Sequence, residues 1–289
     1  MDIDALRYFL MIAREENITK AAEILHISQP TLSRQMMQLE QEVGVKLLVR
    51  TNHNVTLTEE GFLFRRRAQD VVSLIEKAKD EVSEKEEMVS GTISIGCGEL
   101  RSVSELAGIL SSFQAKYPRV KYELFSGSNE EIQEKLEQGT LDAALFLQPF
   151  NAEAYDYVDM KTKESWGILV HKDLKLADHD VIRPGELVGT LVMTVRIGTA
   201  VQRELARWSG EYAKDMDYFA NYNVLHNAVV IARQRKGVVI CIESDFTYED
   251  MKFIPFEPVL SFGSLLAWKR DTPSSKTRKA FLEFVHSAI

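Results

Sequence analysis

Residues Thr19 to Arg50 read TKAAEILHISQPTLSRQMMQLEQEVGVKLLVR, and this stretch decides how the first part of the chain folds. Thr19 is a suitable N-cap for a short helix. Ala21 and Ala22 on that helix carry so little side chain that another helix can cross it closely. Upstream, apolar residues at helical spacing predict a first helix: Leu6, Phe9, Leu10 and Ala13.

A third helix is expected over Gln29–Val43, capped by Ser28 or Gln29. Pro30 suits the first turn of a helix, and Gly44 suits the position just after its end. One face of this helix is apolar, at Leu32, Met36, Leu39 and Val43. The remaining residues offer hydroxyls, amides and one guanidinium, which suit contacts to base edges and phosphates: Thr31, Ser33, Arg34, Gln35 and Gln38.

Residues 46–57 predict a two-stranded wing, with Arg50 and His53 near its tip. Two helices joined by a tight turn and followed by a hairpin make a winged helix-turn-helix. Residues 1–57 are therefore expected to form an all-α winged helix-turn-helix DNA-binding domain, with Ser28 among its contact candidates. A small three-helix bundle also has polar outer faces, and it stays open as the alternative.

The charge of the chain gives only weak support to DNA binding. Its net charge is −8, whereas a nucleic-acid binder usually contains a basic domain. Across residues 27–57 the charges nearly cancel, with three cations against two carboxylates: Arg34, Lys46 and Arg50 against Glu40 and Glu42. We expect modest phosphate attraction per subunit, to which helix N-termini contribute.

Residues 58–90 predict one long helix, capped by Thr58, that links the N-terminal domain to the rest of the chain. Apolar residues recur along it in a heptad pattern, at Phe64, Ala68, Val71, Ile75, Ala78 and Val82. A helix of about 30 residues spans about 45 Å, too long for one small domain to cover. We expect this seam to pack against its copy in a second subunit; packing on its own chain is the alternative. A two-fold dimer would read an inverted repeat.

The stretch 19–50, followed by VTLTEEG at 55–61, closely resembles the N-terminal signature of LysR-type transcriptional regulators. The resemblance implies a dimeric or tetrameric regulator that binds promoter DNA and responds to a small-molecule effector. It implies that Gln29, Thr31, Ser33 and Arg34 face the DNA groove, that Arg50 is the wing arginine, and that Thr19 contacts the backbone. His53, Met37 and Gln38 stand where the family often has basic residues.

From residue 91 onward, strands alternate with helices, which predicts an α/β domain with parallel strands. The pattern divides into lobe I, residues 91–162 and 266–289, and lobe II, residues 163–265. The chain is expected to cross between them near 161–164 and 264–268. Two lobes with two crossings resemble the periplasmic-binding-protein arrangement of the family's effector domain.

Ligands of such sheets bind beyond the carboxyl ends of the strands, near helix N-termini. The effector-site candidates at these ends are Cys97, Gly98, Glu99, Ser126, Ser128, Gln148, Thr194, Thr199 and Asn223. Serine and threonine at such turns are also ordinary helix caps. Glu99 would repel a carboxylate, so a cationic or neutral effector, or a Glu99 turned to solvent, both stay open. Cys97 and Cys241 are expected to be inert thiols, although a redox role stays open.

Several classes of protein are disfavoured. No phosphate-binding loop, dinucleotide fingerprint, nucleophile elbow or metal-ligand spacing is found, so we expect no enzyme, cofactor or metal. No apolar run approaches the roughly 18 residues of a bilayer span, which predicts a cytoplasmic protein without a membrane partner. Two other functions remain: a small-molecule carrier that has lost DNA binding, and a constitutive DNA-binding repressor without an effector.

Overall fold

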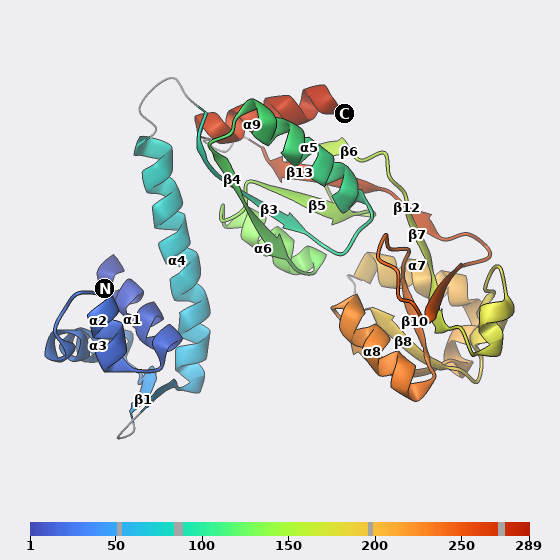
Figure 1. Ribbon diagram of the computed structural model, residues 1–289, viewed down its shortest axis with the longest axis horizontal. Helices are drawn as coiled ribbons and strands as arrows, with labels where there is room; N and C mark the ends of the chain where they lie inside the picture. The colour runs from blue at the N-terminus through green and yellow to red at the C-terminus, as the bar shows by residue number, and fades with distance from the viewer. Residues whose placement is uncertain (51–53, 84–88, 196–198, 271–274) are drawn as a thin grey trace. The chain divides into compact units, whose positions relative to one another are not determined.

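The computed structural model describes residues 1–289 apart from 51–53, 84–88, 196–198 and 271–274 (Figure 1). It divides into two compact units, Met1–Glu84 and Lys85–Ile289, and the long helix belongs to the first of them.

The N-terminal unit contains the three predicted helices and the predicted wing. Its elements are α1 (Ile3–Glu15), α2 (Ile18–Ile24), α3 (Gln29–Val43), β1 (Leu48–Arg50), β2 (Val55–Leu57) and α4 (Glu59–Ser83). Strands β1 and β2 pair antiparallel. Ala21 and Ala22 are almost fully buried, as the expected close helix crossing requires.

Helix α3 has the predicted limits, because local signals define both of its ends. The Ser28 hydroxyl caps it by accepting from the Thr31 amide at 3.3 Å. Gly44 ends it with φ of 82°, a left-handed conformation that favours glycine. The predicted cap of α2 was wrong. Asn17 supplies it by accepting from the Lys20 amide at 3.0 Å, so Thr19 lies inside the first turn.

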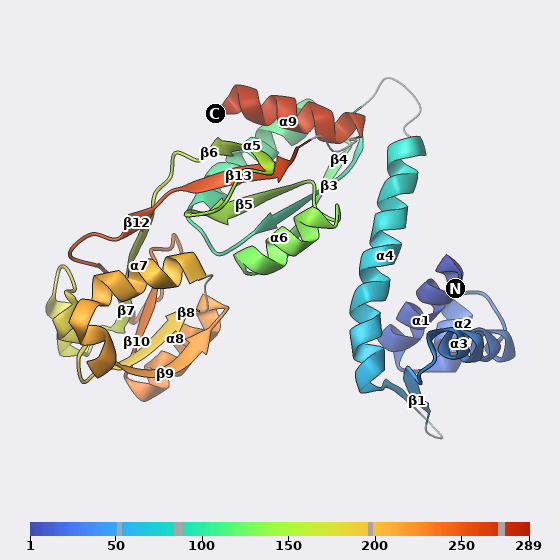
Figure 2. The ribbon, with the colours of Figure 1, turned by 180° about the vertical axis from the view of Figure 1, so that it is seen from behind.

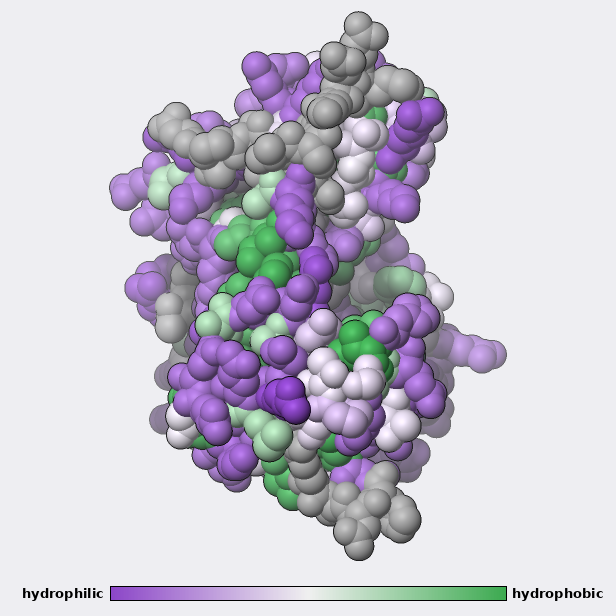
Figure 3. Space-filling view, turned by 90° about the vertical axis from the view of Figure 1, so that its left-hand side faces the viewer, coloured by the Kyte–Doolittle hydropathy of each residue, from purple (hydrophilic) through white to green (hydrophobic). Residues whose placement is uncertain are grey.

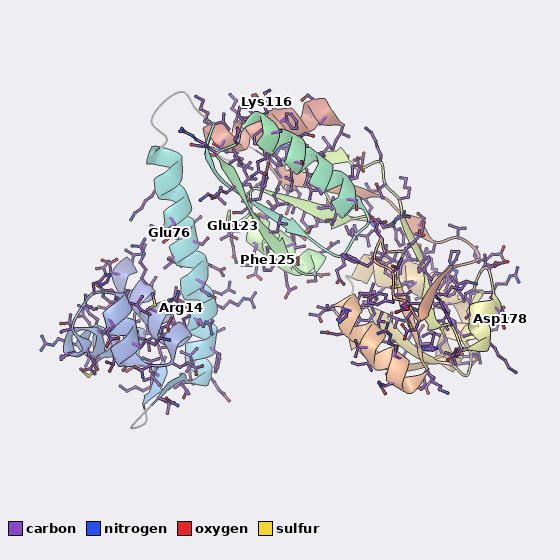
Figure 4. The ribbon with its side chains drawn as sticks, viewed as in Figure 1. Arg14, Glu76, Lys116, Glu123, Phe125 and Asp178 are labelled. Atoms are coloured by element: carbon purple, nitrogen blue, oxygen red, sulfur yellow. The ribbon has the colours of Figure 1, made fainter. Side chains whose placement is uncertain are left out.

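The long helix packs with part of its apolar side on α1 of its own unit, instead of presenting the whole predicted seam to a second subunit. It runs over 25 residues, Glu59–Ser83, and the expected continuation to residue 90 passes through 84–88, which lie outside the described residues. Phe64 meets Phe9 of α1 edge to face at 5.3 Å between ring centroids, and Ala68 is buried in the same core. Arg7 of α1 also pairs with Glu76 at 3.2 Å (Glu76 is labelled in Figure 4).

The predicted seam is therefore corrected at its first two positions, since α1 of the same chain covers Phe64 and Ala68. Val71 and Ala78 are exposed, and Ile75 is partly buried. The Val82 side chain lies outside the described residues.

Lobe I is a five-stranded sheet in the order β4-β3-β5-β13-β6. Its elements are β3 (Gly91–Cys97), α5 (Ser102–Lys116), β4 (Val120–Ser126), α6 (Asn129–Glu137), β5 (Ala143–Leu147), β6 (Tyr155–Asp159), β13 (Ser264–Lys269) and α9 (Lys276–Ala288). Helices α5 and α9 cover one face of the sheet and α6 covers the other (Figures 1 and 2). Strands β3, β4 and β5 are parallel, as predicted, whereas β13 and β6 make the sheet mixed.

Lobe II is a second mixed sheet, in the order β11-β7-β10-β8-β9 with β12 beside β7. Its strands and α-helices are β7 (Glu164–His171), β8 (Leu191–Val195), α7 (Thr199–Ser209), β9 (Asp217–Tyr222), α8 (Leu225–Arg235), β10 (Val238–Ile242), β11 (Met251–Pro255) and β12 (Ser261–Phe262). Three short 3-10 helices accompany them, at Lys175–Asp178, Pro184–Leu187 and Gly210–Asp215. Helix α7 packs on one face and α8 on the other.

The chain crosses between the lobes after β6 and again at Gly263, between β12 and β13. The second crossing lies slightly before the predicted boundary. Ser264 already pairs with Leu147 of β5, so Ser264 and Leu265 belong to lobe I.

Candidate DNA-binding surface and effector domain

The exposed face of α3 presents few charged groups. Thr31, Arg34 and Gln38 are exposed on it, while Leu32 and Met36 on the opposite face are buried in the core. Gln29 at the first turn is also exposed and Ser33 is half-buried. The predicted division of the helix into a packed stripe and a polar face is therefore present.

Two of the candidate hydroxyls at the start of α3 bond to each other. Ser28 Oγ and Thr31 Oγ1 are 2.8 Å apart. This pair fixes the first turn, so Ser28 serves first as the helix cap. Further along, the Gln38 amide donates to Glu42 at 3.2 Å, which holds Gln38 toward the end of the helix.

The wing is tied to α3 by a carboxylate that the sequence gave no reason to single out. Glu40 is only 5 % exposed and accepts from the Leu47 and Leu48 amides at 2.9 and 3.1 Å. Lys46 Nζ lies 2.8 Å from its other oxygen. Burial alone would raise the pKa of Glu40, but these three donors together lower it. Glu40 could not be told from an exposed glutamate in the sequence, because its partners Lys46, Leu47 and Leu48 come only after the helix has ended.

Three other DNA-binding candidates are placed only in part. Thr19 is exposed in the first turn of α2. Arg50 ends β1, and its side chain lies outside the described residues, as does the whole of His53. These three roles stay predictions.

In lobe I the structure brings four effector-site candidates to one edge of the sheet. Cys97 ends β3 and pairs in register with Ser126, which ends β4. A Cβ added to Gly98 would lie 3.8 Å from the Gly127 carbonyl, so the two turns are close neighbours. Ser128 caps α6 in a capping box with Glu131, and its hydroxyl is therefore committed to the helix end.

The other candidates are more dispersed. Gln148 donates to Asp159 at 3.1 Å, next to the crossing at Gly263. Thr194 is the next-to-last residue of β8, at the strand end as predicted, and pairs with Asn221 of β9. Asn223 is exposed after β9, and the Thr199 side chain lies outside the described residues.

Glu99 forms a contact that joins the two lobes. Its carboxylate accepts from the Leu225 amide of α8 at 2.9 Å, across 126 positions of sequence. Val224, the residue before α8, offers no side-chain cap. Glu99 is exposed, so its side chain reaches solvent, and one of its carboxylate oxygens also bonds to a helix end of lobe II.

A second buried carboxylate stands at the first crossing. Glu164 is fully buried and accepts from the amides of Arg101 and Ser102 at 2.9 and 3.0 Å, at the start of α5. Nearby, Arg101 Nη1 lies 2.7 Å from Glu243 of lobe II. Glu164 could not be singled out from the sequence, because a carboxylate at the start of a strand is usually exposed.

Both thiols are buried. Burial raises the pKa of Cys97, although a hydrogen bond with Ser126 opposes the shift. Burial also raises the pKa of Cys241. Since the thiolate is the reactive form, both are weak nucleophiles at neutral pH, which supports the expectation of inert thiols.

Comparison with known proteins identifies the family. Residues 3–62 match the profile of the bacterial regulatory helix-turn-helix proteins of the lysR family, and residues 86–289 match that of the LysR substrate-binding domain. The chain belongs to the LysR family of DNA-binding transcriptional regulators. The resemblance inferred from residues 19–61 is confirmed, and so is the predicted fold class.

Curated relatives of this LysR-type protein are themselves regulators. It is 38 % identical over 146 residues to the HTH-type transcriptional regulator BsdA of Bacillus subtilis, covering 50 % of each chain. It is 34 % identical over 191 residues to the hca operon transcriptional activator HcaR of Escherichia coli, covering 65 % of this chain and 63 % of that one. The alignment therefore spans about half of the first relative's length and nearly two thirds of the second's.

Solved LysR-family structures share the whole fold. CbnR, a LysR family transcriptional regulator, superposes with a TM-score of 0.73 at 19 % identity, covering 100 % of this chain and 99 % of CbnR. Full-length CbnR in complex with its target DNA gives 0.72. At 19 % identity the likeness to CbnR shows the fold alone. The two family profiles cover residues of both units.

Within the part of the chain that the structure describes, none of the helices combines the length and apolar composition of a bilayer span. The face drawn in Figure 3 is mostly hydrophilic, with small apolar patches between the polar side chains. Among the same described residues, no group of histidine, cysteine and carboxylate side chains is arranged to hold a metal ion.

Proposed function

We propose that this LysR-type protein is a cytoplasmic regulator, without catalytic activity of its own, that binds inverted repeats in promoter DNA as a dimer or a pair of dimers. The observation that carries the proposal is the exposed face of α3, with Arg34 and Thr31 displayed on a helix whose opposite face is buried. Such a helix places its N-terminal residues against base edges in the major groove. Membership of a DNA-binding family supports the same role.

The proposal predicts a salt-dependent preference for particular DNA sites. From a pool of random genomic fragments, the full chain should retain inverted repeats with half-sites one helical turn or a multiple apart. The log–log dependence of affinity on salt should have a slope no steeper than about −6, because each subunit carries few cations near α3. Retention of no fragment at low salt would instead favour the small-molecule carrier.

Dimerisation is supported by an apolar stripe of α4 that the other elements of the N-terminal unit leave exposed. Leu63 is 67 % exposed, Val71 is 43 % exposed and Leu74 is 44 % exposed. These residues and Ala78 fall on one side of the helix, adjacent to the side that packs on α1. This stripe differs from the predicted seam at the N-terminal end of α4. There, Leu63 is exposed, whereas Phe64 and Ala68 of the predicted seam pack on α1. A second copy of the same helix is the partner that it fits.

Substituting one stripe residue tests the dimer. Leu74→Asp places a charge in the middle of the stripe, where pairing of two helices would bury it. We expect the sedimentation mass of the full chain to fall by half, or from tetramer to dimer. Gln69→Asp adds the same charge at another exposed position of α4 and should leave the mass unchanged. Equal masses for both variants and the parent chain would exclude this interface.

The α/β unit is proposed to bind a small-molecule effector that favours one arrangement of the DNA-binding domains over another. A ligand shifts such an equilibrium only by its difference in affinity for the two states. A metabolite panel measured by thermal shift identifies the effector, since a bound ligand raises the unfolding temperature by mass action. A constitutive DNA binder would show DNA binding with no response to any compound of the panel.

A further inference from the structure

The turn after β3 carries the polar contacts that tie lobe I to lobe II. Glu99 accepts from the amide of Leu225. Arg101 pairs with Glu243, and Ser104 donates to Asp245 at 2.8 Å. The lobe I side chain in each of these three contacts belongs to the same short segment, residues 99–104.

The contact of Glu99 completes a helix of the opposite lobe, just as Glu164 of lobe II does for the start of α5 in lobe I. The first amides of α8 have no partner within the helix, and Val224 before it has no side-chain oxygen to give. The carboxylate of Glu99 supplies that partner from 126 residues away and adds a negative charge at the positive end of the helix dipole. The two effects together make a helix N-terminus a good position for an anion.

The charge of Glu99 is also felt by side chains of lobe II. Burial raises the pKa of Tyr248, and the charge of Glu99 raises it further. Burial likewise raises the pKa of Tyr222, to which the charges of Cys241 and Glu99 add. These directions agree with the position of Glu99 beside α8 that its hydrogen bond to Leu225 gives.

We propose that Glu99 is a built-in anionic ligand of α8, which latches the two lobes together and excludes carboxylate effectors from that helix end. The position that a ligand carboxylate would use is filled by the chain itself. An external anion must therefore displace Glu99 and also overcome its charge. The exclusion of carboxylate effectors rests on the proposed effector role. The contact between the lobes does not depend on DNA binding.

Chemical rescue tests the latch in the full-length protein. Glu99→Ala removes the carboxylate and leaves room for a small anion, and we expect it to lower Tm by about 2–4 °C, as loss of a helix cap does in a domain of this size. Sodium acetate should restore part of that loss, relative to sodium chloride at equal ionic strength. The parent chain and Glu99→Gln, whose side chain still fills the position, should show no acetate-specific gain.

A second carboxylate of lobe I provides a further control. Glu153→Ala removes an exposed carboxylate from lobe I and should respond to acetate as the parent chain does. An unchanged Tm in Glu99→Ala, or a loss that acetate and chloride affect equally, would overturn the proposal. Neither readout involves DNA, so failure of the latch and failure of the proposed DNA-binding function are separate results.

Discussion

Replacing Arg34 with alanine is expected to weaken binding to the preferred DNA site by about 10- to 100-fold, while non-specific binding changes little. Arg34 is exposed near the middle of the polar face of α3 and is the only cation of that helix. A guanidinium in the major groove forms paired hydrogen bonds with guanine, and alanine offers none. The effect should be largest for the preferred base and small for sequences that already lack it.

The measurement compares the preferred site with the same site altered at one base pair at a time. In the parent chain, one altered position should cost about 1–3 kcal/mol, and that penalty should disappear in Arg34→Ala. Arg119→Ala removes one exposed positive charge from the other unit and serves as the charge-matched control. A variant that loses affinity equally for all sequences would show that Arg34 contacts phosphate instead of a base.

The parts of this fold that sequence predicts well are those with local causes. Helix α3 has its predicted limits because Ser28, Pro30 and Gly44 each act within one turn of the helix end. The cap of α2 was assigned to Thr19 instead of Asn17 because both residues have capping side chains and lie two positions apart. Neighbouring alternatives of this kind differ by little energy, so sequence predicts the helix better than its first residue.

Features with distant causes could not be predicted. Helix α4 forms where the heptad pattern predicted a helix, but Phe64 and Ala68 face α1, and only the packed unit shows which side of the helix is left exposed. Glu99 was correctly placed at a strand end, whereas its partner Leu225 lies in another lobe. Glu40 and Glu164 are buried by partners that follow from the fold rather than from their neighbours in sequence.

Replacing Glu40 with alanine is expected to destabilise the N-terminal unit by about 3 kcal/mol, the largest loss in stability that we predict for one carboxylate here. Two buried amides, those of Leu47 and Leu48, would lose their acceptor. Because they connect α3 to β1, the wing should lose its fixed position beside the recognition helix. Urea unfolding of the full chain, followed by a signal from residues 1–84, measures the loss. Glu23→Ala, at an exposed glutamate of α2, should change stability by less than about 0.5 kcal/mol.

The same carboxylate predicts the direction of the pH dependence. The pKa of Glu40 is lowered in the folded state, because the Lys46, Leu47 and Leu48 donors outweigh the cost of burial. Its stabilising contribution is therefore present above the pKa of an unfolded glutamate, about 4.3, and is lost as pH falls through the lower folded value. In Glu40→Gln the stability of the N-terminal unit should consequently fall less on acidification than in the parent chain. Parallel pH profiles for the two proteins between pH of about 6 and 3 would show that Glu40 acts only by filling space.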